Sequence, residues 1–102
     1  MNRNPNESRA HLDHMERLRS VKTGEAVRQR REAKGWSQRQ LAEFAGISRS
    51  EMQYIETAKR NPKSGTLGRV CDALGISYGE LVTQVDRMLM EHRLKTAGGP
   101  HL

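Results

Sequence analysis

Three serines each stand three residues before a glutamine or a glutamate, and a glycine lies two residues before each serine. The pairs are Ser37 with Gln40, Ser48 with Glu51 and Ser77 with Glu80, and the glycines are Gly35, Gly46 and Gly75. In this pattern the serine oxygen accepts a backbone N–H and the longer side chain returns to the serine N–H, so it marks the start of a helix. A glycine in the left-handed conformation commonly ends one. The chain is therefore predicted to form short helices joined by tight turns.

The same punctuation predicts where the helices lie. Thr23 is expected to cap the first main helix, and Ser64 to cap the fourth, because Pro62 disfavours helix at the residue before it. The predicted helices run from Thr23 to Lys34, from Ser37 to Gly46, from Arg49 to Thr57, from Ser64 to Gly75 and from Ser77 to about Leu94. No stretch alternates long enough for a strand. The predicted fold is a compact all-α domain of five helices.

The two ends of the chain are expected to lie outside this domain. Residues 1–10 read as a frayed polar tail, and the final AGGPHL as disordered. Leu12, Met15 and Leu18 are spaced three apart, so residues 11–22 form either a weakly amphipathic helix or a partly ordered leader. The predicted organisation is an N-terminal extension over 1–22, a domain over 23–83, and an extension of the last helix with a tail over 84–102.

Composition and charge narrow the choice of partner. The 102 residues suffice for one small domain. Only 34% of them are hydrophobic and 4% aromatic, which is too few for the core of a large β-sandwich or for a deep apolar pocket. The net charge is +6, of which +4 falls within residues 22–82. A basic excess on the folded part favours a polyanion as partner, through release of counterions and electrostatic steering.

The chemistry-bearing residues do not assemble into a catalytic or metal site. Cys71 is the only cysteine, and its place on an apolar stripe predicts a buried, inert thiol. His11 and His14 lack a second pair of ligands, so no metal is expected. Without a phosphate loop or an acid/base pair, neither an enzyme nor a cofactor is expected. The unpaired cysteine and the absence of a long apolar run favour a reducing cytosol.

The stretch between Ser37 and Glu56 has the composition of two helices that cross closely. Leu41, Phe44, Ile47, Met52 and Ile55 are expected to line their inward faces. Ala42 and Ala45 let the helix axes approach, and Gly46 occupies a turn that needs a positive φ.

This stretch resembles the helix-turn-helix of the lambda-repressor-like, Cro/XRE-type family. The residues that carry the likeness are Gln38, Leu41, Ala42, Gly46, Ile47, Met52, Ile55 and Glu56. The likeness extends over VRQRREAKGWSQRQLA and ETAKRNPKSGTLGRVCDALGISYGELV, and covers roughly residues 23–83. It implies a sequence-specific, DNA-binding transcriptional regulator, usually a repressor, in the cytoplasm of a bacterium or encoded by a phage or plasmid.

The resemblance also assigns roles to individual residues. The helix from Arg49 to Thr57 would enter the major groove, where Arg49, Ser50, Gln53 and Tyr54 would read bases. Phosphates would be bound at helix N-termini and along the basic loop, by Ser37, Gln38, Arg39, Ser48, Lys59, Arg60, Asn61 and Lys63. Arg31 and Glu56 would pair and hold the reading helix, and Ala42 and Gly46 would support the crossing.

The last helix carries more apolar residues than a small core needs. Leu81, Val85, Met88 and Leu89 are therefore expected to form a dimer interface that matches a palindromic operator, although the helix would alternatively fold back on its own domain. A second alternative concerns the partner. Members of this family also serve as antitoxins, which bind a toxin and regulate their own operon.

Overall fold

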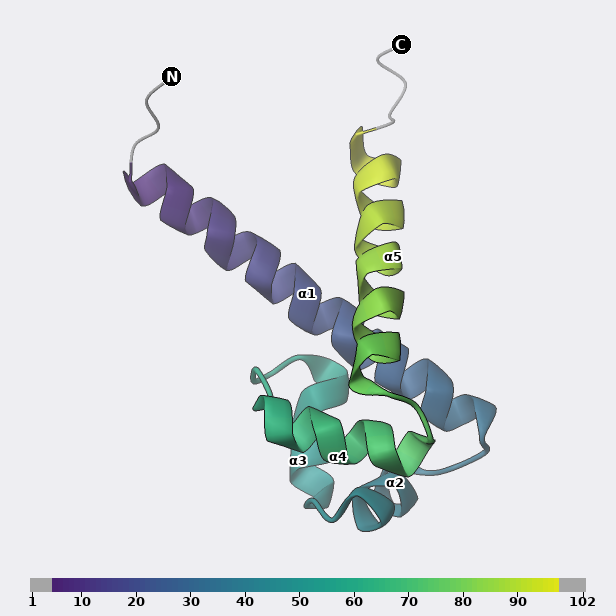
Figure 1. Cartoon of the computed structure of the whole chain (residues 1–102). Helices are drawn as coiled ribbons and strands as arrows, with labels where there is room; N and C mark the ends of the chain where they lie inside the picture. Colours follow the sequence, from purple (N-terminus) through teal and green to yellow (C-terminus); the bar gives the residue numbers. More distant parts are fainter. Residues whose placement is uncertain (1–4, 98–102) are drawn as a thin grey trace.

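The helices of the protein begin and end close to the positions that its serines and glycines predict. A computed structural model describes residues 5–97, and in this range the chain forms five α-helices (Figure 1). They are α1 (Pro5–Ala33), α2 (Gln38–Ala45), α3 (Arg49–Thr57), α4 (Ser64–Leu74) and α5 (Tyr78–Ala97). The predicted all-α fold is confirmed. The expectations for residues 1–4 and 98–102 fall outside the described residues.

Helix ends follow the predicted capping chemistry in most places. Gly35, Gly46 and Gly75 all adopt the left-handed conformation, with φ of 72°, 69° and 75°. Ser37 and Ser77 form complete capping boxes with the residues three positions later. At Ser48 the structure contains one of the two bonds, in which the serine oxygen accepts the Glu51 backbone N–H at 3.0 Å.

Two helix starts differ from the prediction, and one helix ends as predicted but with an unpredicted cap. Thr23 lies inside α1, where its hydroxyl donates to the Arg19 carbonyl oxygen at 2.8 Å and therefore caps nothing. Ser64 is the first residue of α4, and the cap position belongs to Lys63, which makes no side-chain cap bond. α3 ends at Thr57, as predicted, and its C-cap is Ala58, a non-glycine residue with φ 56° that the pattern of glycines does not reveal.

The N-terminal extension is helical from Pro5 onward and is continuous with α1. Neither a frayed segment over residues 5–10 nor a leader separate from the domain is present. The second half of the extension is attached to the domain by two contacts. Leu18 packs on the core, and Arg19 pairs with Asp86 of α5 at 2.9 Å. The first half of α1 and the last half of α5 diverge from the globule as two arms (Figure 1). Leu12, on the first arm, is 66% exposed.

One core unites all five helices. Its buried members are Ala26, Val27, Leu41, Ala42, Ala45, Met52, Ile55, Leu67, Val70, Cys71, Leu74, Leu81, Val85 and Leu89. The prediction for Phe44 was wrong: its side chain is 57% exposed and packs against the Trp36 ring, with centroids 4.8 Å apart. In an eight-residue helix whose inward face is filled by Leu41 and Ala45, Phe44 points to the side.

α5 folds back onto its own domain along its first half. Leu81, Val85 and Leu89 are buried in the core of the chain, and Met88 is partly buried against it. These four residues therefore do not form an exposed surface, and their assignment to a dimer interface is corrected. They pack in the same core as Ala26 and Val27 of α1.

α1 approaches the end of α3 very closely at Gly24. A Cβ atom built there would lie 2.8 Å from the Glu56 carbonyl oxygen and still closer to that of Ile55. Both neighbours are backbone atoms, which cannot rotate away. The absence of a side chain at this position thus sets the distance between the first helix and the predicted reading helix.

An ion pair locks the same two helices a few residues further along. The Arg31 guanidinium donates to both carboxylate oxygens of Glu56, at 2.7 and 2.9 Å, and also to the Trp36 carbonyl oxygen at 2.7 Å. The two side chains are only 11% and 2% exposed. These hydrogen bonds raise the pKa of the Arg31 guanidinium above its ordinary value. The predicted pair is present, and it is buried, so the small energies of surface pairs do not describe it.

A methyl group at Gly24 should push α1 and α3 apart. We expect Gly24→Ala to destabilise the domain by about 1–3 kcal/mol, because overpacking outweighs the better helix propensity of alanine. Urea denaturation followed by circular dichroism measures this. Gly68→Ala in α4 is the matched control: a Cβ there meets no atom within 4 Å, so this change should stabilise by about 0.5–1 kcal/mol. A Gly24 variant as stable as native would refute the close approach.

Removal of either partner of the Arg31–Glu56 pair should leave a buried charge. We expect Arg31→Ala and Glu56→Ala each to lower the free energy of unfolding by about 3–5 kcal/mol. Arg31→Lys should also destabilise, because an ammonium cannot reproduce the two-pronged contact. The control is Arg28→Ala, which breaks the surface pair between Arg28 and Glu32. The side chains of these two residues are 62% and 54% exposed. This variant should change stability by less than about 0.5 kcal/mol. Equal effects at Arg28 and Arg31 would contradict this assignment.

Candidate nucleic-acid interface

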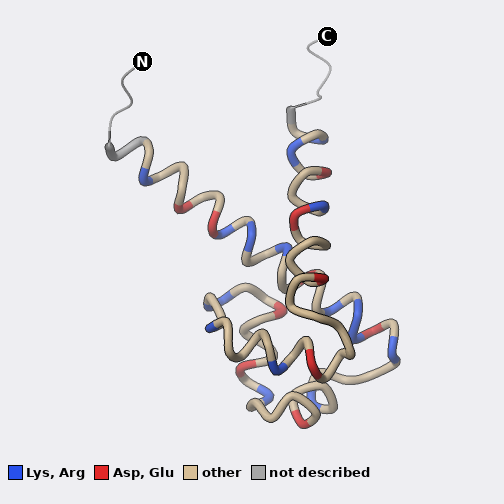
Figure 2. The backbone as a smooth tube through the Cα atoms, viewed as in Figure 1, with Lys and Arg blue, Asp and Glu red and all other residues tan. Residues whose placement is uncertain are grey.

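The predicted DNA-contacting residues lie on α2, on α3 and on the loop between α3 and α4, and this loop lies beside the first arm, formed by α1. α2 and α3 lie together, and the loop between α3 and α4 runs along one side (Figure 1). Figure 2 shows Lys and Arg positions grouped on this loop, at the left of the globule. The structure therefore brings the predicted base-reading helix, the start of α2 and the basic loop to one region.

α3 turns one stripe of side chains to solvent because its other face is buried. Met52 and Ile55 occupy the core. Arg49, Ser50 and Gln53 are exposed, as the predicted reading role requires. α3 therefore presents polar side chains on a short, rigid element, and contact with base edges requires such an element.

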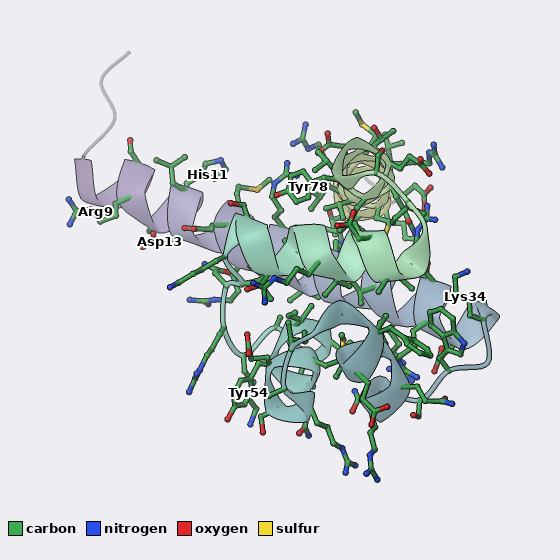
Figure 3. All side chains as sticks on the ribbon, turned by 60° about the horizontal axis from the view of Figure 1, so that its bottom comes forward. Arg9, His11, Asp13, Lys34, Tyr54 and Tyr78 are labelled. Atoms are coloured by element: carbon green, nitrogen blue, oxygen red, sulfur yellow. The ribbon has the colours of Figure 1, made fainter. Side chains whose placement is uncertain are left out.

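Tyr54 is held more firmly than the sequence indicates. Its side chain is half-buried, and the Arg60 guanidinium carbon lies 4.4 Å from the centroid of its ring. Figure 3 shows Tyr54 at the lower edge of the molecule, on the outer side of α3. The stacked arginine connects α3 to the basic loop and restricts the orientation of the ring.

Thr57 belongs to the same surface, although the sequence analysis did not single it out. It is exposed, and its hydroxyl donates to the Gln53 carbonyl oxygen at 2.7 Å, which leaves the oxygen free to accept. Its position seven residues after Ser50 places both on one helical stripe. The i, i+7 spacing was the signal that could have found it.

The N-terminus of α2 combines a cap with a link to the buried ion pair. Ser37 uses its oxygen to accept the Gln40 N–H at 3.0 Å. Gln38 donates from its side-chain amide to Glu56 at 3.1 Å. An amide nitrogen carries two hydrogens, so one remains for an outside acceptor. Gln38 is therefore positioned by the same carboxylate that holds α3.

The other residues predicted to bind phosphates differ in exposure and in their hydrogen-bond partners. Lys59, Arg60 and Lys63 are exposed on the loop. Arg39 is 75% exposed at its side chain, with Glu43 at 3.6 Å. Asn61 is different, because its side chain is hydrogen-bonded to Ser20 and Glu16 of α1. The structure thus places Asn61 beside the basic residues and turns its amide toward α1.

Cys71 is buried, and burial raises the pKa of its thiol, so the thiol is protonated at neutral pH. Among residues 5–97, no group of three or more His, Cys, Asp or Glu side chains could hold a metal ion. Across the same range, none of the helices combines the length and the apolar character needed to cross a bilayer.

Comparison with known proteins gives a consistent result. A family model described as a helix-turn-helix domain matches residues 23–84. The uncharacterized HTH-type transcriptional regulator y4dJ of Sinorhizobium fredii is 36% identical over 69 residues, which cover 68% of this chain and 88% of that protein.

Two solved structures extend the likeness to the fold. The restriction-modification controller protein C.AhdI from Aeromonas hydrophila is 37% identical, with a TM-score of 0.59 over 61% of this chain and 94% of that one. The clp gene regulator ClgR from Corynebacterium glutamicum is 28% identical, with a TM-score of 0.71 over 78% of this chain and 84% of that one. Together with the geometry of α2 and α3, these matches show that the chain belongs to the helix-turn-helix family of DNA-binding transcriptional regulators of the Cro/XRE type, which are not enzymes.

Proposed function

We propose that this regulator binds a palindromic operator as a homodimer and represses transcription by occupying a promoter. The observation that carries the proposal is the solvent-facing stripe of α3, whose opposite face is fixed by the core and by the Arg31–Glu56 pair. A reading element must be both exposed and rigid, since base recognition depends on side-chain placement within a fraction of an ångström.

Within the major groove, the exposed residues of α3 offer distinct chemistry. Arg49 suits a two-pronged contact with guanine, and Gln53 suits adenine. Ser50 is able to donate or accept, and Tyr54 offers a ring to a thymine methyl group or its hydroxyl to a phosphate. Thr57 lies at the end of the stripe and would reach the flank of the site.

Phosphate contacts would surround this stripe on two sides. The N-termini of α2 and α3 each present free N–H groups and a positive dipole end, flanked by Ser37 with Gln38 and by Ser48. Arg39 lies on α2, next to Gln38. On the other side, the loop carries Lys59, Arg60 and Lys63. These contacts would set the orientation of the protein without reading sequence.

Dimerisation is supported by a row of exposed apolar residues along α5. Met90 and Leu94, 53% and 64% exposed, form an i, i+4 row on the last half of α5. Tyr78 and Val82, 45% and 37% exposed, lie on another side of the helix, beside α1, because each step of four residues turns about 40°. Rows of this kind interdigitate when two helices cross. A two-fold contact along this row would give two copies of α3 for the two halves of a palindrome, about 34 Å apart. No feature of residues 5–97 favours the antitoxin alternative over this proposal.

Substitutions on α3 should alter sequence preference, whereas those on the loop should not. Selection from a random DNA pool should enrich one motif with two-fold symmetry. In Arg49→Ala or Gln53→Ala, discrimination at one position per half-site should fall by about 1–3 kcal/mol, because a base contact is lost.

Lys63→Ala is the comparison variant for this experiment. It should weaken all sequences similarly and reduce the slope of log K against log salt by about one unit per half-site. If the pool yields no motif at moderate salt, the proposal fails. If both classes of variant behave alike, the orientation of α3 is wrong.

A charge in the exposed row of α5 should dissociate the dimer. We expect Met90→Lys and Leu94→Lys to shift the protein toward monomer in sedimentation equilibrium, because each would bury a lysine in an apolar contact. Glu91→Lys, one position off the row, is the control and should leave the association constant within about twofold. A native protein that stays monomeric, or equal effects of all three variants, would contradict this interface.

A further inference from the structure

The first eighteen or so residues of α1 lie outside the part of the chain that the family model matches. That match begins at residue 23, yet α1 begins at Pro5 and continues without a break. This extension runs past the loop between α3 and α4. Asp13, Glu16 and Ser20 face that loop across a shallow polar hollow, whose other wall is formed by residues 58–61. Figure 3 shows Asp13 on this side of α1.

The loop needs external support because it has little structure of its own. It begins at Ala58 in the left-handed conformation and ends before α4 at Lys63, a cap position without a side-chain cap bond. Lys59, Arg60 and Lys63 are exposed. Each residue of a loop that becomes ordered on binding loses conformational freedom, so a loop that is already anchored binds a phosphate with a smaller entropic cost.

The extension provides such an anchor through Asn61. Ser20 donates from its hydroxyl to the Asn61 side-chain oxygen, and the Asn61 amide nitrogen donates to Glu16 at 3.4 Å. Glu16 and Ser20 are four residues apart, so they lie on one face of α1, and each forms a hydrogen bond with a different atom of the same amide. Both polar atoms of Asn61 are thereby engaged within the protein.

α1 is itself held in place by the residues next to Ser20. Arg19, next to Ser20, pairs with Asp86 of α5 at 2.9 Å, and Leu18 packs on the core. The loop is therefore connected through Asn61 to α1, and through Arg19 to α5. A segment that was merely a tail would make none of these contacts.

We infer that the N-terminal extension positions the phosphate-binding loop, with Asn61 as the positioning residue and Ser20 and Glu16 as its holders. This inference rests on the proposed role of Lys59, Arg60 and Lys63 at DNA, and it replaces the expectation that Asn61 binds a phosphate through its side chain. The extension then strengthens binding to every DNA sequence by ordering the loop. It also places one cation, Arg17, in the hollow beside the loop.

The first test is a double-mutant cycle on operator affinity with the full chain. Ser20→Ala and Asn61→Ala should each weaken binding by about two- to fivefold, the scale of one net hydrogen bond. The double variant should be no weaker than Asn61→Ala alone, because both changes remove the same link. The salt slope should stay native, in contrast to Lys63→Ala. Ser8→Ala, earlier on α1, is the control and should bind as native.

Glu16 allows a test in which charge is held constant. Glu16→Gln and Glu16→Ala both remove a negative charge near the DNA, but only glutamine keeps an oxygen that accepts from Asn61. Glu16→Gln should therefore bind about two- to fivefold more tightly than Glu16→Ala. Equal affinities of the two would mean that Glu16 acts through charge alone and would overturn its part in the anchor.

A measurement without DNA separates this inference from the proposed function. The backbone heteronuclear ¹⁵N NOE of residues 59–61 and 63 should fall in Ser20→Ala and in Asn61→Ala, and remain native in Ser8→Ala. If native protein binds no DNA, the proposed function fails while the loop measurement still decides the inference. If the loop is as rigid in Ser20→Ala as in the native chain, or if Ser20→Ala and Asn61→Ala act additively on affinity, the inference is overturned.

Discussion

The geometry of this regulator depends on one buried contact, the two-pronged ion pair between Arg31 and Glu56. The pair ties the last turns of α1 to the last turn of α3. Glu56 also accepts from Gln38 at the start of α2, and Arg31 also donates to the Trp36 carbonyl oxygen in the turn between. One carboxylate thus sets the relative positions of three helices. Because both side chains are largely shielded from water, removal of either one leaves the other with a single weaker partner.

The close approach at Gly24 completes this arrangement. An ion pair limits how far apart two helices lie, and a glycine against backbone oxygens sets how near they come. Between these limits, α3 has little freedom to rock against α1. The extension of α1 holds the basic loop in a similar way, through hydrogen bonds to Asn61 in place of an ion pair. A single long helix therefore supports both the reading helix and the loop beside it.

Local chemistry accounts for the parts of the fold that were predictable. Capping serines and left-handed glycines act within one turn of chain, so α2, α3, the end of α4 and the start of α5 were placed to within a residue or two. Predictions failed where distant contacts decide. Thr23 has the chemistry of a cap, but contacts of α1 with α5 and the loop keep the helix running through it.

The same division holds for the candidate site. Sequence by itself determined the helical class, the family, and the outward face of α3, since burial of Met52 and Ile55 follows from periodicity. Only tertiary structure decided that Leu81, Val85 and Leu89 belong to this chain's own core, that Arg60 covers Tyr54, and that Asn61 turns to α1. The physical reason is range. Caps and helical periodicity act over a few neighbouring residues, whereas the partner of an exposed polar or apolar side chain depends on which distant helix the fold brings beside it.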